Sequence, residues 1–279
     1  MPLNMRWLGT ACFEIRLPDD QTVIIDPYVD DSVSAPVRSE AFHACDYILI
    51  THGHYDHVLD VGKLADRFSP EIFCNDVTAD SLINVQGVDA GLIHRIHPGE
   101  RIERKGVEVD VLKGVHVDFS KEYRRLTGRD LPAHAQPVTT VTEGLKVMLG
   151  TDQVPDRFEE WMATYPGGEQ LNYGIEPAGG KRVYMAGTYP QPDIIEVAGT
   201  AQADITLLQV LPGNTVHGME EQIARLAIAS GCRIAIPQHH DPLFRGSVKT
   251  DLSELRRVLA SNSDIEFQEL VPGNWTVFE

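Results

Sequence analysis

Residues 51–57 read Thr51-His52-Gly53-His54-Tyr55-Asp56-His57. An apolar segment, residues 47–50, precedes them and is predicted to be a strand. Imidazole and carboxylate groups without thiolates are typical ligands of zinc, iron or manganese. Alternate side chains of an extended chain share a face, so we expect His52, His54 and Asp56 to converge, while His57 serves a second ion about 3.5–4 Å away. The stretch therefore predicts a catalytic metal site with a coordination position open for water.

The composition is that of a globular protein with an excess of acidic groups. The chain has 279 residues, of which 42% are hydrophobic, and its formal net charge is −17. A chain of this length can bury a large core, and we expect one domain over residues 1–279. The negative charge disfavours a phosphate backbone as the main partner. We therefore expect a small-molecule substrate and no nucleic-acid partner.

The cysteines and the N-terminal segment favour a reducing compartment. The cysteines are scattered without a CxxC pair, so free thiols are expected at Cys12, Cys45, Cys74 and Cys232. The chain begins with a strand-like segment instead of a secretory leader, and no apolar run approaches about 18 residues. We expect a cytoplasmic protein without a membrane span, and a homo-oligomer stays open.

Strand and helix patterns alternate along most of the chain. Helices are predicted at residues 61–68, 79–85, 219–230 and 252–260. Strands are predicted at residues 5–8, 11–17, 22–25, 71–74, 172–176, 182–187, 205–208, 233–236 and 275–277, and a pair of strands that turns at Lys105-Gly106 is predicted within residues 102–111. Residues 119–168 lose this alternation and are rich in charge, proline and aromatic side chains. We predict an insertion there.

Five further motifs lie around the histidine cluster: Trp7-Leu8-Gly9-Thr10, Ile25-Asp26-Pro27, Gly114-Val115-His116, Tyr184-Met185-Ala186-Gly187 and Ile236-Pro237-Gln238-His239. Together with the His-x-His-x-Asp-His run, their order resembles the metallo-β-lactamase superfamily. The closest resemblance is to the branch of ascorbate-phosphate lactonase-like hydrolases and N-acyl phosphatidylethanolamine phospholipase D. It covers nearly the whole chain outside the predicted insertion. It implies an α/β (α+β) fold, a four-layer αββα sandwich with a metal site at one edge of the two sheets.

The resemblance also implies the ligands of two ions, which are His52, His54 and His116 for one and Asp56, His57 and His239 for the other. In the family, the residue at the place of Asp56 also orients the metal-bound water and accepts its proton. Asp26 resembles an early aspartate that supports the ligands, with a simple turn before Pro27 as the alternative. The role of His240 stays open between lining the pocket, contacting substrate, stacking in the core and binding metal.

Thr188 departs from the family, which has an aspartate bridging the two ions at this place. A threonine hydroxyl is a poor ligand and supplies no bridging charge. We therefore predict one tight ion, zinc first with manganese or iron as alternatives, and a second ion that is weak or absent. A replacement carboxylate is the other interpretation, with Asp118, Asp193 and Asp241 as candidates.

These features predict a metal-dependent hydrolase that uses a metal-activated water. Its substrate would be an ester, lactone, amide or phosphodiester of a small molecule. Residues 119–168 would form a lid or an apolar acyl pocket beside the site, with a dimer contact or a plain packing helix as alternatives. Two other functions stay open: a metal-binding, non-catalytic sensor or scaffold of the same fold, and a nuclease or phosphodiesterase.

Overall fold

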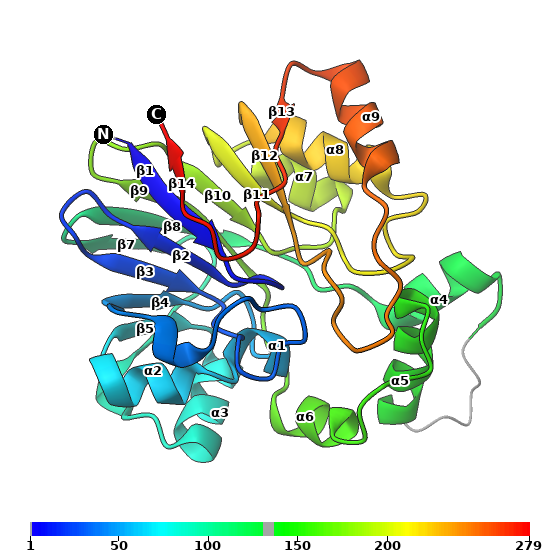
Figure 1. Cartoon of the computed structure of the whole chain (residues 1–279), viewed down its shortest axis with the longest axis horizontal. Coiled ribbons are helices and arrows are strands. Elements are labelled where there is room, and N and C mark those ends of the chain that lie inside the picture. The colour runs from blue at the N-terminus through cyan, green and yellow to red at the C-terminus, as the bar shows by residue number, and fades with distance from the viewer. Residues whose placement is uncertain (1, 131–136) are drawn as a thin grey trace.

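The computed structural model describes residues 2–130 and 137–279, and of residues 137–141 it describes the backbone alone. Two seven-stranded sheets form its centre (Figure 1). The first sheet has the order β14-β1-β2-β3-β4-β5-β6. Its strands are β1 (Leu3–Trp7), β2 (Phe13–Arg16), β3 (Thr22–Ile25), β4 (Tyr47–Leu49), β5 (Glu71–Cys74), β6 (Ile93–Arg95) and β14 (Thr276–Phe278).

The second sheet has the order β13-β12-β11-β10-β9-β8-β7. Its strands are β7 (Arg101–Arg104), β8 (Val107–Lys113), β9 (Leu171–Pro177), β10 (Val183–Ala186), β11 (Ile205–Gln209), β12 (Ile234–Gln238) and β13 (Glu266–Phe267). Each sheet joins antiparallel strands to a run of parallel strands, β3 to β6 in the first and β10 to β13 in the second. Parallel neighbours need crossover connections, and helices supply most of them here.

Helices cover the outer faces of both sheets. Those of the first sheet are α1 (Tyr55–Val58), α2 (Val61–Phe68) and α3 (Asp76–Gln86), and those of the second are α7 (Pro192–Ala198), α8 (Glu220–Ala229) and α9 (Ser253–Asn262). Short 3₁₀ helices lie at Ser39–Ala41 and Ala90–Leu92. None of the helices in the described part of the chain is long and apolar enough to cross a membrane.

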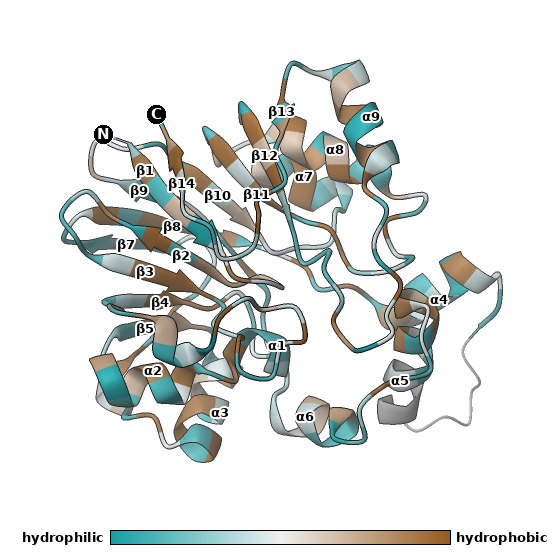
Figure 2. Cartoon of the chain, in the orientation of Figure 1, coloured by the Kyte–Doolittle hydropathy of each residue, from teal (hydrophilic) through white to brown (hydrophobic). Residues whose placement is uncertain are grey.

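Apolar side chains explain why the sheets stack. One buried cluster joins alternate residues of both sheets, including Phe13 and Ile15 of β2 with Val109 and Val111 of β8. Two further clusters fill the space beneath the outer helices. Figure 2 shows the central strands rich in hydrophobic residues, whereas α8 and α9 carry hydrophobic and hydrophilic residues together. The predicted αββα sandwich is confirmed.

Element boundaries follow local signals. The predicted helix at residues 61–68 and strand at residues 71–74 coincide with α2 and β5. Helix α3 is longer than predicted, because the Asn75 side chain accepts a hydrogen bond from the Thr78 amide at its start and Gly87 ends it in the left-handed conformation. The sequence patterns missed α1 and α7, which have only 4 and 7 residues.

Residues 119–168 contain helices α4 (Phe119–Thr127), α5 (Pro137–Leu149) and α6 (Phe158–Thr164). Helix α5 packs against both α4 and α6, and Figure 1 shows the three grouped at one end of the sandwich, next to α1. Residues 131–136 of the predicted insertion lie outside the described part of the chain. The interpretation of this region as an insertion into a single domain stays a prediction.

Candidate metal centre

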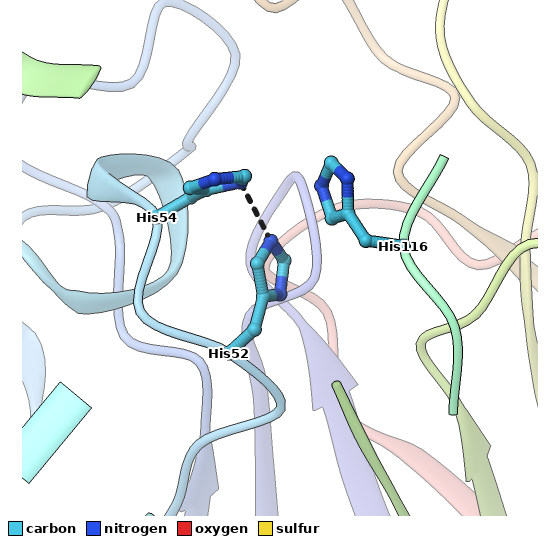
Figure 3. Close-up of side chains that lie close together, drawn as sticks. All are labelled: His52, His54 and His116. Atoms are coloured by element: carbon cyan, nitrogen blue, oxygen red, sulfur yellow. Dashed lines mark hydrogen bonds between the residues drawn. The ribbon is translucent and has the colours of Figure 1, made fainter. Parts of the chain in front are cut away.

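The first group of candidate ligands joins two loops. His52 and His54 follow β4, and His116 follows β8. Figure 3 shows the three rings directed toward one another from these loops. One ring nitrogen of each residue lies within 4.8 Å of the others, and His52 Nε2 is 3.0 Å from His54 Nδ1. Three converging imidazoles fit a zinc-type ion that keeps one position for water.

The second group adjoins the first. It consists of Asp56, His57 and His239, whose ligand atoms also lie within 4.8 Å of one another, and all three residues are buried. His239 follows β12, and its Nε2 lies 3.3 Å from Asp56 Oδ2. The rings of His52 and His57 are 4.0 Å apart between centroids, so the two groups touch.

The prediction that Asp56 converges with His52 and His54 along an extended chain is wrong. Helix α1 begins at Tyr55, so the alternation of side chains ends there and Asp56 turns toward His57 and His239. The spatial grouping follows the two sets that the family resemblance implies. Metal binding by these sets stays a prediction.

Asp26 fixes the orientation of His57. Its Oδ2 lies 2.8 Å from His57 Nδ1, and its two oxygens accept hydrogen bonds of 2.7 and 2.6 Å from the amide and hydroxyl of Thr51. A carboxylate at Nδ1 leaves Nε2 of the same ring free for an ion. His116 is oriented similarly, because its Nδ1 lies 2.9 Å from the Val117 carbonyl oxygen.

Burial sets the charge of the ligands. It lowers the pKa of His54 to about 3 and that of His116 to about 4, and it holds the pKa of His52 well below its usual range. Burial also opposes ionisation of Asp56, yet His57 and His239 hold the pKa of that carboxyl below its ordinary value. Neutral imidazoles and an ionised carboxylate are the forms that bind a cation.

For His57 the pKa shift has the opposite direction from that of the other three histidines just described. Burial lowers its pKa, but the Asp26 and Asp56 carboxylates outweigh this effect and raise the pKa above the ordinary value. A cation in the second group would replace that proton.

Glycines that the sequence analysis did not single out support His54. The Gly53 amide donates a 2.8 Å hydrogen bond to the carbonyl of Gly167. A Cβ atom on Gly167 would lie 3.0 Å from His54 Nε2, so only glycine leaves the ring in place without a shift. Asn75 Nδ2 donates a 3.1 Å hydrogen bond to the same carbonyl of Gly167. The only signal in the sequence is glycine itself, within His-Gly-His and after Pro166.

Thr188 has a different role from a metal ligand. Its hydroxyl accepts a 2.8 Å hydrogen bond from the Val115 amide and donates a 3.1 Å bond to the Val115 carbonyl. The Tyr189 amide donates to the same carbonyl from 2.8 Å. The end of β10 is thereby tied to the loop that carries His116.

The three candidate replacement carboxylates all have other partners. Asp118 accepts from the amides of α4, Asp193 pairs with Lys113 at 3.0 Å, and Asp241 accepts from the Thr10 amide at 2.9 Å. None of them joins a ligand group among the described residues, so this structure gives the replacement interpretation no support.

His240 also lies apart from both groups. Its ring stacks on Trp7 with centroids 4.9 Å apart, so among the roles left open for His240 the geometry matches stacking in the core.

We expect the second group to hold its ion more weakly than the first. Among the described residues, no carboxylate belongs to both groups and could offset repulsion between neighbouring cations. Elemental analysis after dialysis should give close to one zinc per chain, and Thr188→Asp should raise the occupancy of the second position. Thr188→Ser, which keeps the hydroxyl, serves as the control. Two equally tight ions in the unmodified protein would contradict this expectation.

Both ligand groups lie at the floor of a pocket. Its walls come from the segment after β8, from α4, α5 and α6, and from the segments that follow β11 and β12. The predicted insertion therefore does contribute to the surroundings of the site.

Comparison with known proteins supplies the family. The sequence model described as "Metallo-beta-lactamase superfamily" matches residues 5–168. A UPF0173 metal-dependent hydrolase of Rubrobacter xylanophilus is 25% identical over 238 residues, which cover 85% of this chain and 81% of the relative. A UPF0173 metal-dependent hydrolase of Roseiflexus sp. is 34% identical over 120 residues, 40% of this chain and 47% of the relative. The chain spans about a third to a half of the length of the first curated relatives it matches.

Solved structures share the fold over the whole chain. The metallo hydrolase Igni18 of Ignicoccus hospitalis superposes with a TM-score of 0.68 at 16% identity, covering 100% of this chain and 99% of its own. An isothiocyanate hydrolase from Delia radicum gut bacteria gives a TM-score of 0.64 at 17% identity, with the same coverage. At such identities the likeness concerns the fold alone.

Proposed function

Since this chain belongs to the metallo-beta-lactamase superfamily, we propose that it is a metal-dependent hydrolase of a small-molecule ester, lactone, amide or phosphodiester. The observation that carries the proposal is the pair of touching ligand groups at the floor of one pocket. Zinc is the ion that the three-imidazole group suits best, and manganese and iron are alternatives.

The chemistry divides between the ion and the protein. When bound, the ion supplies a water with a pKa lowered to about 7 and polarises the bond under attack. Asp56, a buried and ionised member of the second group, would orient the attacking water and accept its proton. Asp26 holds His57, and the Thr188 hydroxyl holds the loop of His116, so the ligands keep their directions.

Relatives support the same reaction class. The UPF0173 proteins that match this chain are described as metal-dependent hydrolases. The lactonase-like branch that the motifs resemble agrees with this class. A sensor or scaffold of the same fold would bind metal without turnover, and a nuclease would need cationic side chains around the site.

Removing and restoring the metal tests the proposal. Protein stripped with a chelator should hydrolyse p-nitrophenyl esters, lactones and amides at least about a hundredfold more slowly than protein reloaded with one equivalent of zinc. Manganese and iron are tested in parallel, with bis-p-nitrophenyl phosphate as the phosphodiester. Equal turnover with and without metal would contradict the proposal, and metal binding without turnover of any substrate would favour the sensor.

A further inference from the structure

We propose that the pocket lined by the two ligand groups binds an uncharged, apolar acyl or aryl group of the substrate and favours such a group over a charged one. This inference rests on the proposed hydrolase function and narrows its substrate class. The chemistry of the pocket walls carries it.

Apolar side chains from four segments of the chain line the pocket. Phe119 comes from α4, Leu145 and Met148 from α5, Phe158 and Met162 from α6, and Leu243 from the loop after β12. Most small-molecule sites combine such apolar walls with a few placed polar groups. Here the polar side chains are the candidate metal ligands together with Gln209 and Tyr55.

The described lining contains no lysine or arginine. Nearby cationic side chains have other partners: Lys146 pairs with Glu143 at 2.9 Å, and Arg125 pairs with Glu122 at 2.7 Å. Apart from histidines, the only charged side chain among the described lining residues is the Asp56 carboxylate. A charged group that enters the apolar part of the pocket would give up hydration without gaining a cationic partner from these walls, so the walls disfavour it.

The apolar wall is built onto the helix that carries a ligand. Tyr55, the residue before Asp56, stacks on Trp161 of α6 with centroids 4.8 Å apart. It also meets the edge of Phe158 at 6.0 Å, and Phe158 meets Phe244 at 5.9 Å. Because Phe158 is buried within this aromatic network, the wall is formed before any substrate binds.

Gln209 supplies a neutral polar contact. It ends β11 and lines the pocket, and its Oε1 is buried without a hydrogen-bond partner among the described residues. Buried polar atoms are normally satisfied, so a water or a ligand is expected to supply the partner there. An amide side chain suits the N–H, hydroxyl or carbonyl of an uncharged molecule and adds no charge to the pocket.

Binding to the metal-free protein tests this inference separately from turnover. Saturation-transfer NMR titrations compare hexanamide with hexyl phosphate, which have the same number of carbon atoms and different polar heads. We expect hexanamide to bind at least about tenfold more tightly, and each methylene removed from it to weaken binding by about fourfold. Equal affinity for the two ligands, or no binding of hexanamide, would overturn the inference.

Variants locate the binding in the pocket. Met162 is half-buried on α6, and Met162→Glu should weaken hexanamide at least about tenfold, whereas Met162→Leu should leave it nearly unchanged. Val271→Glu, at a side chain that is 63% exposed elsewhere, is the matched control for added charge. Loss of binding in Val271→Glu, or its retention in Met162→Glu, would place the ligand outside this pocket.

The two proposals fail in different ways. If hexanamide binds but the zinc-loaded protein hydrolyses no neutral substrate, the proposed hydrolase function is contradicted. The inference that the pocket binds an apolar group would still hold. If esters are hydrolysed but hexanamide does not bind, the proposed hydrolase function is supported. The apolar pocket would then not determine which substrates are hydrolysed.

Discussion

Replacing His54 and His116 together with alanine is expected to remove the tightly bound ion from the purified protein. These residues come from different loops and supply two of the three imidazoles of the first group. One imidazole cannot hold a divalent ion in a defined geometry, so we expect zinc affinity to fall by more than about a hundredfold. Competition with a chromophoric chelator measures the affinity, and elemental analysis measures the ion that remains.

A matched variant removes two histidines outside the site. His97 and His217 are exposed and belong to neither ligand group. The double change His97→Ala with His217→Ala should therefore leave the zinc content unchanged. If the double variant at His54 and His116 keeps its ion as tightly as the unmodified protein, the three-imidazole group is not the tight site.

The superfamily was recognisable from the sequence because its motifs are short, local and ordered. The His-x-His-x-Asp-His run lies directly after a strand, and the apolar alternation of the early strands is visible without the structure. The resemblance to the superfamily and the αββα fold are confirmed by the family match and by structures that share the fold. The particular lactonase-like branch stays a prediction.

The arrangement of Asp56 could not be derived from alternation. A helix of 4 residues leaves too short a pattern to detect, yet α1 decides which histidines Asp56 meets. The family resemblance carried this information where local geometry did not. The spacing therefore showed that these side chains lie close together, but it did not show which of them form each candidate group.

Contacts between distant segments explain the other gaps. The sequence shows that Thr188 lacks a carboxylate, but not that its hydroxyl holds the backbone of Val115. It shows glycine at position 167, but not the imidazole of His54 against it. The side of α5 and α6 that faces the ligands depends on the packing of three helices, which periodicity does not determine.

Asp56→Asn is expected to abolish most of the hydrolysis while leaving the tight ion bound. Asparagine keeps the size of the side chain but loses the charge and the capacity to accept a proton. General-base catalysis contributes roughly a hundredfold to ten-thousandfold, so kcat/KM on a neutral ester should fall within that range. Because Asp56 lies with His57 and His239 and not with the three imidazoles, zinc content should stay close to one ion per chain.

The control is Asp193→Asn, which alters an exposed carboxylate that pairs with Lys113 away from both groups. It should retain full kcat/KM and full metal content. Unchanged turnover in Asp56→Asn would make this carboxylate structural and would exclude it as the proton acceptor. Loss of the tight ion together with activity would show instead that the two groups bind metal as one unit, since the touching rings of His52 and His57 would then transmit the change. Measuring metal and turnover on the same preparation separates these outcomes.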